Sequence, residues 1–179
     1  GIFMTTVSQH DDESQHGFSR FGHTSEKFID RGSDLPFAVS LSSLTLHLAA
    51  ISIGPAVHLY NFNKDREVGL EELISFRADF CEDKQADVSH VKFCGNTIVT
   101  AGTERIIRVW KIDIDKSPCE IELVSQLVPI KKDINDLHAM IKSNALGRLK
   151  VAAASDDGHL RVWELAVDDQ PTRSSTALI

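Results

Sequence analysis

The sequence predicts an all-β fold assembled from a repeated unit, and three observations support this prediction. The first is an internal repeat: residues 99–112 and 152–165 both carry Arg-Val-Trp after a run of small residues and a turn. The second is a weaker copy at residues 49–62, in which Tyr60 occupies the position of the tryptophan. The third is the period of about 50 residues, which is typical of repeat architectures. The repeated region covers residues 35–166.

Each copy has the pattern of a β-hairpin. In the second copy, residues 97–101 are small or apolar, residues 102–105 suit a turn, and residues 106–112 return as a strand. The last copy has the turn Asp156-Asp157-Gly158 between two such strands. Asp-Gly favours a hairpin because glycine tolerates the positive φ that these turns require.

These residues resemble the WD-repeat family, whose four-stranded blades assemble into a β-propeller. In that family an acidic residue in the hairpin turn, six positions before the tryptophan, helps to fix the blade through buried hydrogen bonds. Asp157 matches this position in the last copy, Glu104 is a longer substitute in the second, and Gly54 in the first cannot make the contact. None of the three copies opens on the Gly-His pair that commonly begins such repeats. The resemblance implies structural roles for Glu104, Trp110, Asp157, Trp163 and Tyr60.

The chain is expected to contain three WD-like blades, at about residues 35–66, 67–114 and 115–166. Disordered polar tails are predicted at residues 1–34 and 167–179 from their composition. A closed propeller takes about four to eight blades, so three blades correspond to a partial propeller. Such a piece leaves sheet faces open at both ends. We expect a fragment of a larger propeller; the alternatives are a gene model cut short and closure with another chain, including dimerisation through the open blade edges.

The composition excludes several function classes. The 179 residues include 19 basic and 26 acidic side chains, a net charge of −7, which argues against binding to nucleic acid. The sequence opens on no signal-peptide pattern and contains no apolar stretch of the roughly 20 residues that a membrane span requires. Cys81, Cys94 and Cys119 fit no zinc spacing, and we interpret them as free thiols in a reducing, cytoplasmic compartment.

No catalytic, cofactor or metal site is predicted, and the chain is not expected to be an enzyme. It has neither a Gly-x-Ser-x-Gly elbow nor a glycine-rich phosphate loop. Asp156 and Asp157 could be taken for a carboxylate pair, but adjacent residues in a hairpin turn point apart. His10, His16 and His23 lie on the polar tail, where nothing holds three imidazoles in one geometry. Protein partners are the expected ligands.

A narrower resemblance rests on four short stretches around the second copy. These are Ala-Asp-Phe at 78–80, Val-Lys-Phe at 91–93, Asn-Thr-Ile-Val-Thr-Ala-Gly-Thr at 96–103 and Arg-Val-Trp-Lys-Ile at 108–112. They resemble the family of guanine-nucleotide exchange factors of the endoplasmic reticulum that act on Sar-type GTPases and start COPII coat assembly. The resemblance implies a Sar-type small GTPase as partner, a role in vesicle transport, and a location at the cytosolic face of the endoplasmic reticulum.

Two parts of that family have no counterpart in the sequence. No run of glycines before Phe37 corresponds to the potassium-binding loop of the family, and no apolar membrane anchor follows the last blade. We therefore expect this chain alone to have no exchange activity. The alternative is a general WD-repeat scaffold unrelated to GTPase exchange.

Overall fold

The computed structural model describes residues 2–8, 22–29, 36–42, 47–62, 71–82, 86–141 and 148–166. Within these ranges the chain forms strands, turns and bends without a helix, which confirms the predicted all-β class. The described residues therefore contain no apolar helix of membrane-spanning length. The chain divides into two units, Gly1–Leu35 and Pro36–Ile179, and each is described by itself.

The first unit contains one antiparallel strand pair. β1 (Ile2–Ser8) pairs with β2 (Gly22–Ile29), with Ile2 opposite Ile29 and Ser8 opposite Gly22. The structure describes strands in these two segments of the region predicted as a disordered tail, residues 1–34. The segment Ile-Phe-Met-Thr-Thr-Val is rich in β-branched and aromatic residue types, which favour extended backbone. The rest of residues 1–34 and the predicted tail at 167–179 lie outside the described residues.

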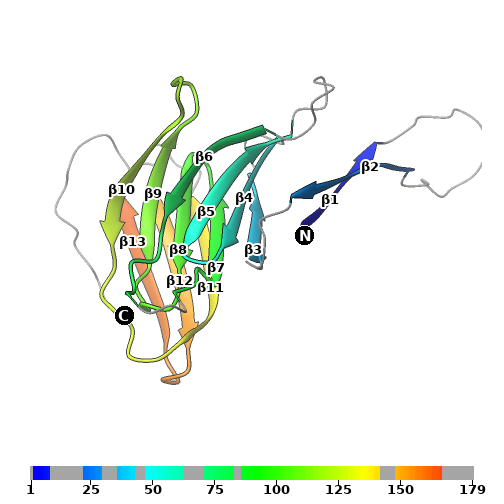
Figure 1. Ribbon diagram of the computed structural model, residues 1–179. Helices are drawn as coiled ribbons and strands as arrows, with labels where there is room; N and C mark the ends of the chain where they lie inside the picture. The colour runs from blue at the N-terminus through cyan, green and yellow to red at the C-terminus, as the bar shows by residue number, and fades with distance from the viewer. Residues whose placement is uncertain are drawn as a thin grey trace, which may run out of the picture. The chain divides into compact units, whose positions relative to one another are not determined.

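The second unit consists of three antiparallel sheets, in each of which consecutive strands are neighbours (Figure 1). We call them the first, second and third sheets. The first contains β3 (Pro36–Leu41), β4 (Leu48–Ile53), β5 (Ala56–Asn61) and β6 (Glu71–Arg77). The second contains β7 (His90–Cys94), β8 (Thr97–Ala101), β9 (Arg108–Asp113) and β10 (Glu120–Gln126). The third contains β11 (Ile134–Ile141), β12 (Arg148–Ser155) and β13 (Leu160–Ala166).

The boundaries between the sheets differ from the predicted blade boundaries by one strand. β6, assigned from the sequence to the second blade, pairs with β5 of the first sheet, where Ile74 lies opposite Leu59. β10, assigned to the third blade, pairs with β9 of the second sheet, where Ile121 lies opposite Ile112. In both cases a short connection follows the preceding strand, β5 or β9. The chain therefore returns antiparallel beside that strand, in the same sheet. The sheets therefore cover residues 36–77, 90–126 and 134–166.

The second sheet is covered by the first sheet on one face and by the third on the other. Successive side chains of a strand point to opposite faces, so each strand of this sheet contributes to two cores. In β8, Ile98 belongs to the core shared with the first sheet, whereas Val99 belongs to the core shared with the third. The first strands of the sheets are also neighbours, because β7 contacts both β3 and β11.

Candidate interaction surface at the turn end of the sheets

The turns and links at one end of the three sheets form a continuous surface, which we call the turn surface. It consists of the β4–β5 turn at 54–55, the described parts of the β6–β7 link at 78–82 and 86–89, the β8–β9 turn at 102–107, the β10–β11 link at 127–133 and the β12–β13 turn at 156–159. Backbone hydrogen bonds join these segments: the N–H groups of Val88, Thr103 and Asp156 donate to the carbonyls of Gly54 (2.8 Å), Asp87 (3.0 Å) and Asp133 (3.0 Å). The turn surface lies at the lower end of the sheets in Figure 1.

Asp79 is the buried centre of the β6–β7 link. Its carboxylate accepts hydrogen bonds from the backbone N–H of Cys81 (2.9 Å) and of Glu104 (3.2 Å), so it joins the link to the β8–β9 turn. Gly102 is required beside it, because a Cβ at this position would lie 2.2 Å from the Asp87 carbonyl oxygen and 2.5 Å from Asp79 Oδ2. The sequence indicated Asp79 only as part of the stretch at 78–80 that resembles an exchange-factor family, and it did not predict this buried role.

Glu104 forms an ion pair with an arginine of its own hairpin. Its carboxylate pairs with Arg108 Nη2, and Arg108 Nη1 donates to the Ala78 carbonyl oxygen at 3.0 Å. The buried guanidinium also lies over the ring of Phe80, 4.8 Å from its centroid. Phe80 is half-exposed, so this contact holds an aromatic ring in place at the surface of the β6–β7 link.

Asp157 makes the corresponding contacts in the third sheet. It accepts hydrogen bonds from Arg161 Nη2 (2.6 Å), Arg161 Nη1 (3.0 Å), Ser155 Oγ (2.5 Å) and the backbone N–H of His159 (3.1 Å). The hydrogen bonds from Arg161 and then from Ser155 hold the pKa of Asp157 well below its usual range. The same ion pair raises the pKa of Arg161. Gly158 follows at a φ of 79°, which glycine adopts readily.

The three aromatic repeat positions are buried packing residues. Trp110 lies in the core between the first and second sheets, where its Nε1–H donates to Thr100 Oγ1 at 2.9 Å and its ring lies 4.8 Å from that of Phe76. Trp163 belongs to the core between the second and third sheets. Tyr60 is buried on the first sheet, and its hydroxyl donates to Glu72 Oε2 at 3.5 Å.

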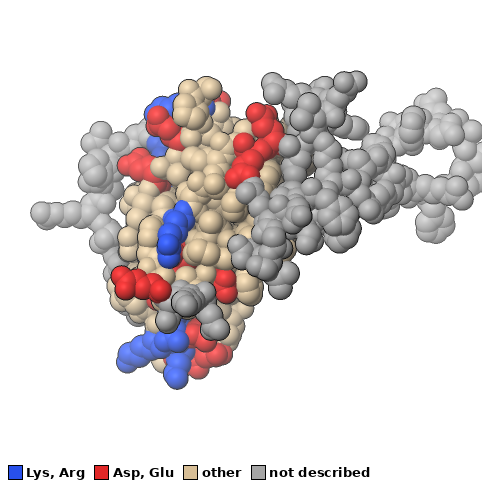
Figure 2. All heavy atoms as spheres, viewed as in Figure 1, with Lys and Arg blue, Asp and Glu red and all other residues tan. Residues whose placement is uncertain are grey.

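The β10–β11 link is anchored to the β8–β9 turn by Arg105, whose φ is 60°. Its Nε donates to Asp133 Oδ1 at 2.7 Å, and its carbonyl accepts from the N–H of Ile130 at 2.9 Å. Val128, Lys131 and Lys132 are exposed on this link. Figure 2 shows basic and acidic side chains close together at this end of the sheets.

The polar groups described at the β12–β13 turn pair within the hairpin or with the adjacent strand β11. Asp156 accepts a hydrogen bond from Asn135 Nδ2 at 2.6 Å, whereas Asp157 binds Arg161 and Ser155, so the two neighbouring carboxylates have separate partners. Among the described residues, no three His, Cys, Asp or Glu side chains are placed to hold a metal ion. The side chains of His10, His16 and His23 lie outside this description.

The three cysteines are free thiols in the structure. Cys94 is buried in the core between the second and third sheets, and burial raises the pKa of its thiol. Burial also raises the pKa of Cys119, with smaller contributions from Asp113 and Glu120. Both shifts favour the thiol over the reactive thiolate.

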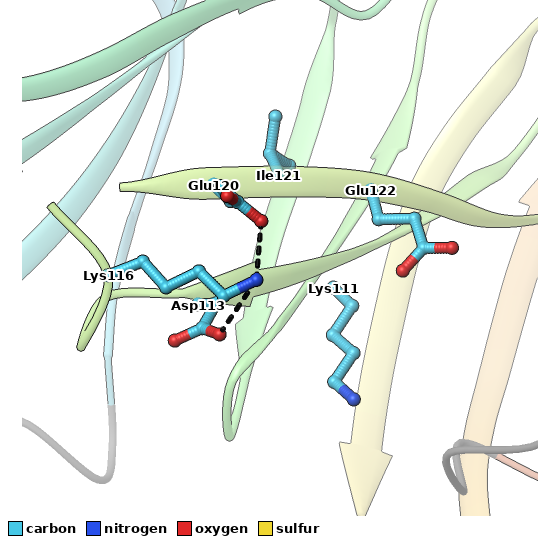
Figure 3. Close-up of a pocket in the computed structure, with 6 residues that line it drawn as sticks. All are labelled: Lys111, Asp113, Lys116, Glu120, Ile121 and Glu122. Carbon is cyan, nitrogen blue, oxygen red and sulfur yellow. Dashed lines mark hydrogen bonds and ion pairs between the residues drawn. The ribbon is translucent and has the colours of Figure 1, made fainter. Parts of the chain in front are cut away.

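A small pocket lies away from the turn surface, beside the β9–β10 hairpin (Figure 3). Its volume is about 150 Å³, and it is lined by Lys111, Asp113, Lys116, Glu120, Ile121 and Glu122. Lys116 Nζ lies 2.6 Å from Glu120 Oε2 and 3.7 Å from Asp113 Oδ2. The hydrogen bond that Lys116 donates to the Glu120 carboxylate raises the pKa of Lys116. Lys116 thus pairs with two of the carboxylates that line the pocket, as is typical of a solvated surface.

Comparison with known proteins identifies the architecture. No protein-family model and no curated protein matches the sequence. Solved structures do match: Sqt1 from Saccharomyces cerevisiae aligns with a TM-score of 0.57 and 19% identity over 84% of this chain and 35% of its own. The WD40 domain of SCAP from fission yeast aligns with a TM-score of 0.56 and 12% identity over 80% of this chain and 31% of its own. The three sheets are part of a WD40 β-propeller.

A further match is a chain of the mitotic checkpoint complex, with a TM-score of 0.54 and 12% identity over 98% of this chain and 48% of its own. The chain thus spans between 31% and 48% of the length of these proteins. At these identities the likeness establishes the WD40 fold and the partial propeller, both of which the sequence predicted. The narrower resemblance to exchange factors has no support among these neighbours.

Proposed function

We propose that the chain is a WD40 scaffold module that binds a protein partner through its turn surface. The observation that carries this proposal is Phe80, a half-exposed aromatic ring held over the buried Arg108 guanidinium at 4.8 Å. Exposed aromatic residues on a rigid support are frequent anchors of protein interfaces. One structural neighbour, Sqt1 from Chaetomium thermophilum, was solved bound to the N-terminus of ribosomal protein L10, which shows that a protein of this fold binds a peptide.

Affinity capture with paired variants tests the role of the turn surface. The tagged chain, a Phe80→Ala variant and an Ile114→Ala variant are used to capture proteins from the same cell extract. Ile114 is an exposed apolar residue in the β9–β10 hairpin, outside the turn surface, and serves as the matched control. We expect at least one partner to bind the unchanged chain and the Ile114→Ala variant but not the Phe80→Ala variant. Equal capture by all three would contradict the proposal.

A second candidate function is a part in a guanine-nucleotide exchange factor for Sar-type GTPases. Its support is the set of stretches at 78–80, 91–93, 96–103 and 108–112, which resemble the matching blade of prolactin regulatory element-binding protein. Several of these residues lie in or beside the turn surface, including Asp79, Phe80 and Gly102. On this proposal the module works at the cytosolic face of the endoplasmic reticulum and binds the GTPase without promoting exchange alone.

Two assays distinguish the candidates. A direct binding measurement with a purified Sar-type GTPase is expected to show an interaction only if the exchange-factor proposal is correct. A GDP-release assay is expected to show no acceleration by this chain in either case. Absence of GTPase binding would leave the general scaffold as the proposed function, whereas accelerated GDP release would contradict the expectation that this chain is inactive alone.

A further inference from the structure

The third sheet differs from the other two in its number of strands. The first and second sheets each contain four strands, whereas the third contains three among the described residues. In the first two sheets the outermost strand, β6 or β10, pairs with the strand that carries the aromatic residue of the repeat. No described strand pairs with the outer side of β13, the equivalent strand of the third sheet. β13 is therefore an edge strand in the described part of the chain, and such edges are templates for pairing with another extended segment.

The outer edge of β13 offers backbone groups for such pairing. In an antiparallel pair, residues that exchange hydrogen bonds with the partner strand alternate with residues whose N–H and C=O groups point the other way. The N–H of Ser155 on β12 donates to the carbonyl of His159 at 3.3 Å, so the residues of β13 that bond to β12 are Arg161 and every second residue after it. The N–H and C=O groups of Leu160 and Val162 therefore point to the outer edge.

A side chain of β10 marks the space beside this edge. The registers of β6 and β10 each skip one residue at a bulge, Leu73 in the first sheet and Val124 in the second. Leu73 packs against the core shared by the first and second sheets, to which Ile121 and Leu123 of β10 also contribute. Val124 is 42% exposed and belongs to neither core. Within the described residues, no outer strand of the third sheet makes the equivalent contribution beside Val124.

The sequence repeat continues beyond β13 in the same spacing as beyond β9. Residues 110–118 are Trp-Lys-Ile-Asp-Ile-Asp-Lys-Ser-Pro, and residues 163–171 are Trp-Glu-Leu-Ala-Val-Asp-Asp-Gln-Pro. Both stretches have apolar residues two and four positions after the tryptophan, an aspartate five positions after it and a proline eight positions after it. In the second sheet, β10 begins ten positions after Trp110, at Glu120. The same interval leads from Trp163 to Arg173.

The pairing of the outer strands gives a second estimate of this interval. The residue opposite the aromatic side chain lies 13 positions after it in the second sheet and 12 positions after it in the first. Counted from Trp163, these intervals reach Thr176 and Ser175, so the two sheets agree to within one residue. Residues 173–179 contain neither glycine nor proline, the residue types that weaken a strand interior.

We propose that the outer edge of β13 binds residues 173–179 of the same chain, which form the fourth strand of the third sheet. In the register of the second sheet, Thr176 lies opposite Trp163 and Leu178 lies opposite Val162. Ala177 then takes the bulge position that Val124 has in β10. For these residues the proposed strand replaces the disordered tail predicted from composition. The site is separate from the turn surface, so it does not depend on the proposed function.

Two proline variants of the full chain test this pairing. In the proposed register the N–H of Ser175 points toward β13, whereas the N–H of Ser174 points away from it. Proline has no N–H, so Ser175→Pro removes a hydrogen bond between the two strands. Ser174→Pro makes the same change one residue earlier, where an edge strand tolerates proline because its N–H faces solvent. It is therefore the matched control.

Amide hydrogen exchange at Val162, followed by NMR, is the readout, because its N–H faces the outer edge and is protected only when that edge is paired. We expect this amide to exchange at least about tenfold more slowly in the unchanged chain and in Ser174→Pro than in Ser175→Pro. The amide of Arg161 bonds to β12 and should stay protected in all three chains, which verifies that the third sheet is folded.

Two results would overturn the proposal. The first is rapid exchange at Val162 in the unchanged chain, which would show that the edge is unpaired. The second is an equal exchange rate in the two variants, because protection would then not depend on a backbone hydrogen bond of this segment, and another chain would be the favoured occupant. The reverse order, with protection lost only in Ser174→Pro, would support the fourth strand in the register of the first sheet.

Discussion

At the scale of single residues, the charged groups of the turn surface stabilise the hairpins that carry them. The acidic turn residue binds an arginine four positions later on the returning strand in two of the repeats, as Glu104 with Arg108 and Asp157 with Arg161. Each arginine stands two positions before the tryptophan. The ion pair thus joins the turn to the strand that places the buried indole.

We predict that Asp157 makes the stability of the third sheet sensitive to acid. The pKa of its carboxyl is lowered in the folded state, mainly by Arg161, relative to about 3.9 in an unfolded chain. The stabilisation is therefore complete above this unfolded value and is lost as the pH falls through the acid range. Urea unfolding of the chain and of Asp157→Asn should show a difference in unfolding free energy that is larger at neutral pH than at a pH of about 3.

Asp156→Asn is the matched control for this experiment. Asp156 lies in the same turn but binds Asn135 rather than an arginine. Its substitution should leave the pH dependence of unfolding close to that of the unchanged chain. An Asp157→Asn variant with the same pH dependence as the unchanged chain would show that the Arg161 contact does not form in solution.

Truncation of Trp163 is predicted to destabilise the fold severely. The indole is buried between the second and third sheets, and removing a buried tryptophan side chain typically costs about 3–5 kcal/mol. Chemical denaturation of Trp163→Ala should show this loss. Val128→Ala, at a strongly exposed position, should change the unfolding free energy by less than about 0.5 kcal/mol. An unchanged transition in Trp163→Ala would contradict the burial of this strand.

At the scale of elements, the hairpins follow from the sequence but the identity of the outer strands does not. Apolar alternation and the Asp-Gly turn define β12 and β13 locally. The same alternation predicts that β6 and β10 are strands, but it does not indicate which sheet each one joins. The neighbour of each strand depends on the length of the connection that precedes it. The strands β1 and β2 were missed because composition, rather than local β propensity, decided the prediction for residues 1–34.

Local sequence patterns also could not predict the buried role of Asp79. Its carboxylate meets the N–H of Glu104, 25 positions away in the chain, and this approach depends on how the β6–β7 link lies beside the β8–β9 turn. The Glu104–Arg108 contact was predicted in part. The WD-repeat resemblance indicated a polar role for Glu104 in the turn but did not indicate Arg108 as its partner.

We predict that Gly102→Ala disrupts the contact between these two elements. The added Cβ would lie 2.2 Å from the Asp87 carbonyl oxygen, a backbone atom that cannot move without shifting the link. Overpacking of this kind costs about 1–3 kcal/mol, which thermal unfolding would detect. Gly158→Asn is the control, since the space around Gly158 is open and asparagine tolerates positive φ. A larger loss in the control than in Gly102→Ala would contradict this account of the turn.

At the scale of the whole molecule, the three sheets stack face to face, with the second between the other two. The sharpest inter-sheet contact is that of Phe76 on β6 with Trp110 on β9, whose ring centroids are 4.8 Å apart. The partial WD40 propeller depends on this stacking.

Nuclear Overhauser effects between these two rings test the stacking most directly. We expect cross-peaks between the ring protons of Phe76 and Trp110, together with cross-strand contacts between Leu59 and Ile74 and between Ile112 and Ile121. Cross-strand contacts without any Phe76–Trp110 cross-peak would show that the sheets form but do not pack as blades of a propeller.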